Sequence, residues 1–315
     1  MPRESTSMNR HSSIGRVLLP VVVLCCTAGA LSAQRTVEIR RAVTPTASIR
    51  ISGAFAELRI RGWSKDSVAI TGTIPADARF DGGFVSSATG PSSGAKYYLE
   101  TPSGVPSGKL EMNVPAGVRV WAKSGSASID VEGITGSLDL NIIGGSVHVA
   151  GNPHDLTVES MDGAVTVEGS PAWTRLKTAT GDIVLAGGSD DAGLTTVSGT
   201  IRVTAGTFER ARIESVTGAV EFGGVVAHGG SLDIDTHSGA IDVRMWPKVG
   251  AEFDVASVAG TIENTLTNRP AVAGREGRGQ EIGFTIGGGG ARVYIRTFKG
   301  NIRLQSMTKA MLKVF

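Results

Sequence analysis

Residues 158–169 read VESMDGAVTVEG, with apolar side chains at alternate positions on both sides of a central glycine. Alternation of this kind predicts β-strands with one buried face, and the glycine predicts a bend between two such strands. Residues 176–187 (LKTATGDIVLAG) and 194–206 (LTTVSGTIRVTAG) repeat the pattern with most polar residues exchanged. The inward half of the phrase is constant and the outward half varies, as stacked strands require.

The phrase occurs nine times. Its central glycines are Gly125, Gly145, Gly163, Gly181, Gly199, Gly218, Gly239, Gly260 and Gly300. Five places before them stand Val120, Leu140, Val158, Leu176, Leu194, Ile213, Ile234, Val255 and Ile295. Two places after them stand Ala127, Val147, Val165, Ile183, Ile201, Val220, Ile241, Ile262 and Ile302. The first eight glycines are 18–21 residues apart, and the final gap of 40 is about two periods. This spacing predicts an all-β fold, a single-stranded parallel β-helix (β-solenoid) whose short coils stack their apolar columns.

A hydroxyl residue stands three places before most of these glycines, as at Ser160, Thr178 and Thr297. Its parity matches the buried column, so we expect a ladder of inward hydroxyl groups at a corner of the stack. No base is placed beside this column, which argues against a serine nucleophile.

The first 33 residues have the three parts of a secretory signal peptide: a basic start, a short apolar run and the small-residue exit ALSAQ. Both cysteines, Cys25 and Cys26, lie in that run, so the exported chain is expected to have no disulfide and no thiolate site. No transmembrane segment is expected after cleavage. The whole chain has 31 basic and 29 acidic residues, a balance that does not favour a nucleic-acid partner.

Three further segments follow the signal peptide. Residues 34–117 are expected to form irregular β-coils with a Gly/Ser-rich loop at 76–96, and residues 118–304 the regular coils, with a loop at 265–280. Residues 305–315 carry apolar side chains and are expected to cap the C-terminal end, because an open strand edge favours aggregation.

Three further stretches carry a resemblance to a known family: IRGWSKDSVAI (60–70), LEMNVPAGVRV (110–120) and IGGGGARVYIRTFKGNIRL (286–304). With the repeated phrases, they resemble a bacterial family known as "putative adhesin" or domain of unknown function, over roughly residues 47–304. The resemblance implies a right-handed β-helical fold and offers no catalytic motif to carry over.

The expected function is therefore that of an exported, non-enzymatic, adhesin-like protein of the bacterial envelope, periplasmic or at the cell surface. Its partner is expected to be an envelope or surface polymer or a protein, and the oligomeric state is left open. The alternative is a carbohydrate-active β-helix enzyme, a polysaccharide lyase or hydrolase.

The enzyme would need a pair of carboxyl groups, one with a raised pKa. Outward columns do contain acids, such as Glu221, Asp242 and Glu263, but with basic residues among them we expect a solvated charge ladder. The last coil is basic, and a polyanion contact is the alternative there to a solvated end face. Its basic residues are Arg292, Arg296, Lys299 and Arg303.

Sharper chemistry is possible at SLDIDTHSG (231–239), where Asp233, Asp235 and His237 alternate and share one outward face. The repeat spacing places Glu214 one coil before Asp235 and Asp254 one coil after Asp233. Carboxylates this close repel unless a cation lies among them. Arg212 can supply that charge; the alternative is a calcium or zinc site, and no other cofactor is expected. Its expected ligands are Asp233, Asp235, His237 and Glu214.

Overall fold

The computed structural model describes residues 33–84, 90–246, 250–274 and 277–307, and these ranges contain no α-helix. Their 24 strands join into one hydrogen-bonded sheet, which confirms the predicted all-β class. Two predicted features lie outside these ranges. They are the signal peptide, apart from Ala33, and residues 308–315 of the expected C-terminal cap.

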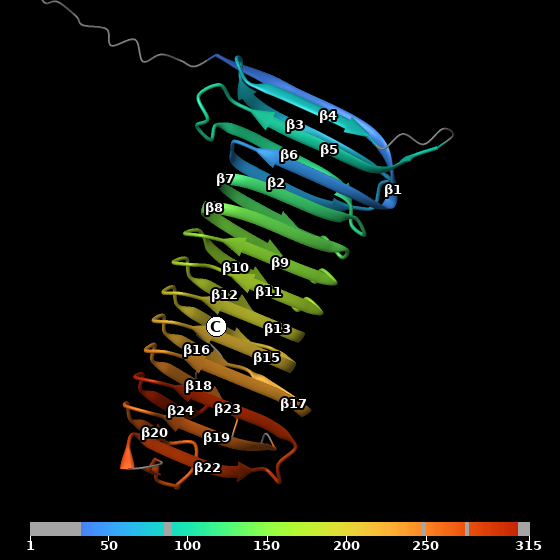
Figure 1. The fold of residues 1–315 in the computed structure, drawn as a ribbon. Helices are drawn as coiled ribbons and strands as arrows, with labels where there is room; N and C mark the ends of the chain where they lie inside the picture. The colour runs from blue at the N-terminus through green and yellow to red at the C-terminus, as the bar shows by residue number, and fades with distance from the viewer. Residues whose placement is uncertain (1–32, 85–89, 247–249, 275–276, 308–315) are drawn as a thin grey trace, which may run out of the picture. The chain divides into compact units, whose positions relative to one another are not determined.

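The central strands pair in parallel in two rows (Figure 1). β7 (Arg119–Glu132) and β8 (Ser137–Ala150) pair along their whole length and belong to both rows. Row A continues from the first half of β8 through β9 (Asp155–Ser160), β11 (Trp173–Lys177), β13 (Ser189–Thr196), β15 (Thr207–Ser215) and β17 (Val225–Thr236). Row B continues from its second half through β10 (Ala164–Glu168), β12 (Ile183–Ala186), β14 (Ile201–Ala205), β16 (Val220–Gly223) and β18 (Ile241–Met245).

The strand register follows the columns read from the sequence, except in the first phrase. Leu140 faces Val158 and Val158 faces Leu176, as the alignment on the central glycine predicts. The partner of Leu140 on the other side is Ala122, however, and not Val120. The first phrase is therefore shifted by two residues from the predicted alignment. Because strands alternate with period two, this shift leaves every inward side chain inward.

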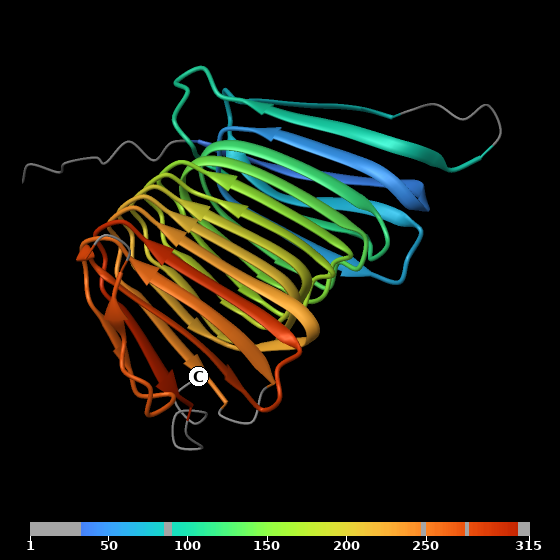
Figure 2. The ribbon, with the colours of Figure 1, turned by 60° about the horizontal axis from the view of Figure 1, so that its bottom comes forward.

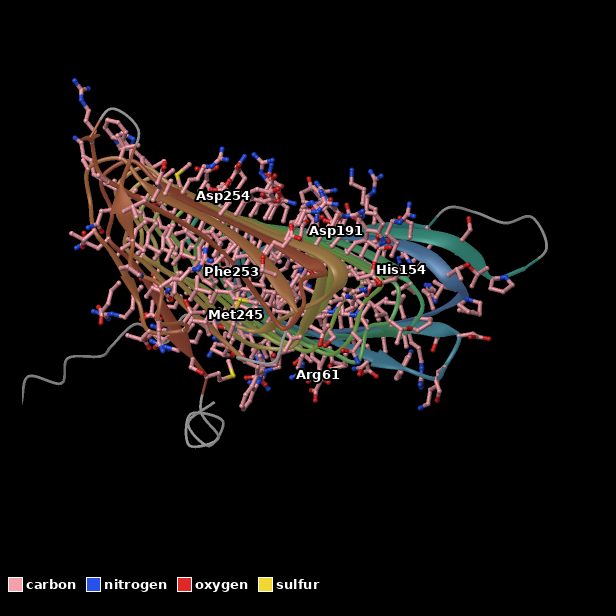
Figure 3. The ribbon with its side chains drawn as sticks, turned by 90° about the horizontal axis from the view of Figure 1, so that it is seen from below. Arg61, His154, Asp191, Met245, Phe253 and Asp254 are labelled. Atoms are coloured by element: carbon pink, nitrogen blue, oxygen red, sulfur yellow. The ribbon has the colours of Figure 1, made fainter. Side chains whose placement is uncertain are left out.

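The inward side chains of both rows form one apolar core. Val158 and Ile201 are fully buried in it. Figure 3 looks onto the ribbon from below and shows Phe253 and Met245 between the strands, with Asp254 and Arg61 outside. With about 25 cal/mol gained per Å² of apolar surface removed from water, this continuous column is the main stabilising element of the fold.

The central glycines are required by the close approach of neighbouring turns. A Cβ atom on Gly199 would lie 2.1 Å from the carbonyl oxygen of Gly181, and one on Gly218 would lie 1.9 Å from that of Gly199. None of these three glycines has a positive φ. Of the two reasons that a glycine column can have, close backbone approach is the one that applies here.

The predicted hydroxyl ladder is present at the end of the row A strands, and all its members are buried. The Thr178 hydroxyl lies 2.6 Å from the carbonyl oxygen of Gly181 and 3.0 Å from Thr196 Oγ1 on the next strand of the row. The ladder is not fully satisfied, because the hydroxyl oxygens of Ser160 and Ser215 have no hydrogen-bond partner among the described residues.

At the C-terminal end, the order of strands in the rows differs from their order in the chain. Row A continues from β17 to β23 (Ala291–Thr297) and only then to β19 (Ala251–Ser257) (Figure 1). β23 therefore lies between two strands that both precede it in the chain. Row B likewise continues from β18 to β24 (Ile302–Ser306) and then to β20 (Ile262–Asn264). β22 (Gln280–Ile286) covers the edge of β19 in antiparallel pairing, and β21 (Val272–Ala273) pairs with β22 inside the expected loop 265–280.

The N-terminal end has the same exchange of order (Figure 2). In row A, β7 is followed by the second half of β1 (Gln34–Gly53), then by β5 (Ser92–Glu100) and the antiparallel β4 (Arg79–Phe84). In row B, β7 is followed by β2 (Phe55–Trp63), β6 (Gly108–Pro115), β3 (Ser67–Pro75) and the first half of β1. β4 and the start of β5 occupy part of the expected loop 76–96. Antiparallel strands thus close both rows at the N-terminal end and row A at the C-terminal end, which protects these edges of the parallel rows.

Candidate binding surface

An exposed apolar column follows the turns between row A and row B. It is formed by the residues two places before the central glycines, and we call it the turn column: Ile143, Met161, Ala179, Val197, Val216, His237, Phe298 and Val258. Ile143 is 58% exposed and Met161 is 56% exposed. Backbone hydrogen bonds join the first four members, as from Met161 N to Ile143 O at 3.2 Å. Each member follows an inward residue, which is a hydroxyl of the ladder in every case except Ile143, and is therefore turned toward solvent.

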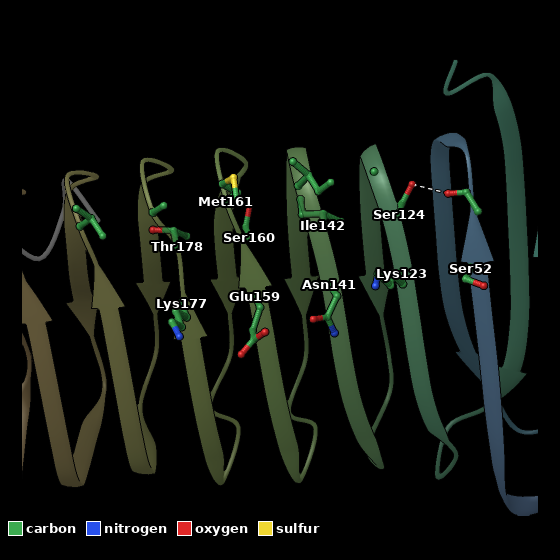
Figure 4. A pocket seen from close by; sticks show the side chains of 15 residues that line it. Ser52, Lys123, Ser124, Asn141, Ile142, Glu159, Ser160, Met161, Lys177 and Thr178 are labelled. Atoms are coloured by element: carbon green, nitrogen blue, oxygen red, sulfur yellow. Dashed lines mark hydrogen bonds between the residues drawn. The ribbon is translucent and has the colours of Figure 1, made fainter. Parts of the chain in front are cut away.

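A groove with a volume of about 690 Å³ lies beside the first part of the turn column (Figure 4). Ile143 and Met161 form its apolar side, and the buried hydroxyls of Ser160 and Thr178 lie between the two sides. Its polar side has one outward residue from each of four strands. These are Lys123, Asn141, Glu159 and Lys177.

A second groove, of about 570 Å³, continues along the same columns toward the C-terminal end. Here Val216 and Phe298 supply the apolar side, and Glu214, Asp235 and Arg296 the polar side. An apolar edge beside a line of mixed charge is a surface that can hold an extended partner by contact along its length.

The acidic residues expected to bind a metal ion lie on this polar side, and the structure brings only some of them together. Asp233, Asp235 and His237 all face solvent, as predicted. Asp235 is paired in register with Glu214 on β15 and with Arg296 on β23. Burial raises the pKa of Asp235, Glu214 raises it further, and Arg296 acts against both.

Two expected neighbours of these acids are differently placed. Tyr294 of β23 lies between Asp233 and Asp254, because β23 is inserted between β17 and β19. Asp254 is thus not adjacent to Asp233, and that expectation was wrong. Arg212 does stand beside Asp233 in register, but its guanidinium donates to Glu214, with Nη2 2.6 Å from Oε1.

The four expected ligands, Glu214, Asp233, Asp235 and His237, do not form a metal site within the described ranges. In those ranges no three His, Cys, Asp or Glu side chains lie close enough together to hold an ion. Glu214 is engaged by Arg212, and the ring of His237 stacks on that of Phe298 at a centroid distance of 5.2 Å. Neighbouring arginines supply the positive charge that these carboxylates need.

Row B carries the solvated charge ladder that the sequence predicts. Arg202 donates to both carboxylate oxygens of Glu221, at 3.0 and 3.1 Å, and this lowers the pKa of Glu221. Arg303 donates to Glu263 at 3.0 Å and lies 3.8 Å from Asp242. The basic last phrase is therefore partly neutralised by acids of the strands on either side.

The turn column was missed by the sequence analysis, although its signal was there. The residues two places before the central glycines are mostly apolar, a character that by itself would suggest a buried position. Their parity places them outside, as at Val197, which is 50% exposed. An apolar residue kept at an outward position of a repeat is the signal that would have found this surface.

Comparisons with known proteins give only distant structural neighbours. No family model matches the chain. No curated protein matches it either. Among solved structures, a "putative cell adhesion protein" from Clostridium sporogenes ATCC 15579 covers 87% of this chain and 100% of its own, at 8% identity and a TM-score of 0.22. A "putative adhesin" from Bacteroides fragilis NCTC 9343 covers 87% and 98%, at 12% identity and a TM-score of 0.38.

Within the described ranges there is no helix that could span a membrane.

Proposed function

We propose that this chain is an exported, non-enzymatic binding protein of the bacterial envelope, adhesin-like in function, in the periplasm or at the cell surface. We propose further that it is a single-stranded parallel β-helix of short coils. The parallel pairing of alternate strands at a nearly constant sequence offset supports this architecture. In such a helix, one turn of the chain brings the next strand alongside the strand one turn earlier.

The observation that carries the proposed function is the turn column beside its two grooves. Soluble proteins rarely expose a contiguous apolar stripe unless it meets a partner. Ile143, Met161 and Val197 are each at least half exposed, and a line of polar residues accompanies them. The stripe follows the strand stacking, so its partner would be an extended polymer or protein segment lying across several strands.

Binding to isolated bacterial envelope fragments tests the proposal. The variant Ile143→Ser/Met161→Ser removes apolar contact from the turn column and should weaken binding at least tenfold. The matched control is Val105→Ser/Val272→Ser, two valines that are 59% and 58% exposed and lie outside the column. Equal binding by the two variants would contradict a role for the turn column, and absence of binding by the unaltered protein would contradict the function itself.

The alternative, a polysaccharide lyase or hydrolase, has one place in its favour. Asp242 is adjacent in register to Glu221, and its Oδ1 is buried without a hydrogen-bond partner among the described residues. Against it, Arg244 donates to the other oxygen of Asp242 at 3.1 Å, whereas such catalysis needs a carboxyl group free to act on the substrate. Release of reducing ends from a panel of polysaccharides, lost in Asp242→Asn, would support the enzyme.

A further inference from the structure

Four basic side chains gather on the outward face of row A near its N-terminal end. Arg50 of β1 is paired in register with Lys96 of β5 on one side and with Trp121 of β7 on the other. Arg119 and Lys123 flank Trp121 at the two neighbouring outward positions of β7. Strands in a sheet lie about 4.8 Å apart, so the four cations share one small area, and all four are exposed.

None of these four cations has a carboxylate within ion-pair distance among the described residues, unlike the arginines of row B. Two acids of neighbouring strands have other hydrogen-bond partners: Asp81 accepts from Arg79 at 2.9 Å, and Asp139 accepts from Asn141 at 2.6 Å. The pKa of Asp155 is lowered first by its hydrogen bond with His154 and, more weakly, by Arg119. Like charges directly opposite each other on adjacent strands are destabilising. The positive charge of the cluster is therefore only partly compensated, and an external anion would relieve the remaining repulsion.

Two aromatic rings lie within this cluster. Trp121 is half-buried between Arg119 and Lys123, and Tyr98, two places along β5 from Lys96, is 42% exposed. Neither ring contacts another aromatic ring or a cation within the described part of the chain. Their free faces can pack on flat, weakly polar groups.

The cluster also lies between two grooves. A groove of about 710 Å³ is lined by Arg50, Lys96 and Tyr98, and by Asp81 and Gly83 of the neighbouring β4. The groove beside the turn column begins on the other side, at Ser52 and Lys123. A chain-like ligand that crosses the cluster would thus continue into the surface that carries the proposed function.

We propose that this cluster, Arg50, Lys96, Arg119 and Lys123 with Trp121 and Tyr98, binds an acidic polysaccharide whose carboxylates are carried on its sugar rings. The proposal rests on the proposed function and names the chemical class of its partner. The charges are spread over three strands and do not converge on one point, which suits a polymer with repeated charges better than a single anion. The aromatic faces suit sugar rings, which a polyphosphate chain lacks.

Calorimetric titration with polygalacturonate oligomers tests this, with dextran as the neutral polymer and inorganic polyphosphate as the polymer without rings. We expect binding of polygalacturonate, no detectable binding of dextran, and at least tenfold weaker binding of polygalacturonate when salt rises from 0.05 to 0.5 M, because added salt screens exposed charges (about 3 Å Debye length at 1 M against about 10 Å at 0.1 M).

The variant Arg50→Gln/Lys96→Gln should weaken binding of polygalacturonate at least tenfold. Its matched control, Lys109→Gln/Arg303→Gln, removes the same net charge from two exposed positions of row B that line neither groove, and should leave binding within twofold. Trp121→Ala should weaken binding of polygalacturonate and leave any binding of polyphosphate unchanged.

Three outcomes would overturn the inference. The first is absence of polygalacturonate binding, and the second is an equal loss of affinity in the two charge variants. The third is that polyphosphate binds as tightly as polygalacturonate and that Trp121→Ala changes neither affinity. Each leaves the proposed function intact if envelope fragments still bind and the turn-column variant still loses that binding. Loss of both kinds of binding in the unaltered protein would remove the proposed function as well.

Discussion

The hydroxyl of Thr236 donates a hydrogen bond to Thr297 Oγ1 at 2.8 Å, although 61 residues separate them in the chain. Ser257 comes between them in sequence but lies on the far side of Thr297 in the row. The chain therefore runs out to β19 and β20 and returns to fill the position that it had passed over. Its last described strands are thereby held on both sides, and neither of them is an edge.

This strand order can be tested with engineered disulfides, because the chain has no cysteine after Cys26. Asp235→Cys/Arg296→Cys joins partners in register on adjacent strands and should form a disulfide on mild oxidation. Asp235→Cys/Ala256→Cys joins residues with β23 between them and should keep free thiols. Mass spectrometry of the non-reduced protein distinguishes the two, and the reverse result would mean that the strands follow chain order.

A second prediction concerns the glycine column. Gly218→Ala would place a Cβ 1.9 Å from the carbonyl oxygen of Gly199, so we expect a loss of unfolding free energy of about 1–3 kcal/mol or more. Gly125→Ala is the control, since a Cβ there has no atom within 4 Å. Its melting temperature should stay unchanged or rise slightly. Equal destabilisation by the two changes would contradict the observed register.

The same two glycines show how far the sequence could predict this fold. Alternation and spacing were enough for the all-β class, the inward faces and the pairing of Val158 with Leu176. They placed Gly125 in the glycine column, whereas it lies two residues off, because a shift of two preserves every inward side chain. The order of β23 and β19 in row A could not be predicted from the sequence either, because both orders bury the same apolar face.

The charged residues were harder to place for a related reason. Outward positions vary freely, so their partners depend on strand order and on side-chain conformation. Asp254 was therefore assigned to the wrong neighbour, and the hydrogen bond from Arg212 to Glu214 could not be predicted from the sequence. The cluster around Arg50 and Lys96 joins segments far apart in the chain, and neither repeat spacing nor local composition indicates that they meet.

A third prediction uses the pKa of Glu221. Hydrogen bonds from Arg202 lower that pKa in the folded protein, so the pair stabilises the fold above the unfolded pKa of about 4.3 and loses its effect as pH falls through the folded value. Glu221→Gln should lower the unfolding free energy by up to about 1 kcal/mol at pH 7. The difference from the unaltered protein should shrink as pH falls below about 4.3 and vanish once the folded carboxyl group is protonated. A difference independent of pH would exclude the ion pair as its cause.

Asp235 should behave in the opposite way. Its pKa is raised, first by burial and then by Glu214, so its ionised form costs stability at neutral pH and that cost disappears as pH falls below the raised value. Asp235→Asn should therefore raise the melting temperature slightly at pH 7 and leave it unchanged at pH 3. A lower melting temperature at pH 7 would mean that attraction to Arg296 outweighs burial.

The last prediction concerns the buried hydroxyl ladder, in which members with and without partners can be compared directly. Ser215 Oγ is buried and has no partner among the described residues, so its burial carries an uncompensated desolvation cost. Ser215→Ala should leave the unfolding free energy unchanged or raise it. Thr236, by contrast, donates to Thr297 Oγ1 and lies 2.9 Å from the carbonyl oxygen of Gly239. Thr236→Val keeps the shape but removes the buried hydroxyl that is hydrogen-bonded to Thr297 Oγ1 and the Gly239 carbonyl, which should cost about 1–3 kcal/mol. Chemical denaturation of the two variants measures both effects, and a larger loss in Ser215→Ala than in Thr236→Val would show that Ser215 has a partner of its own.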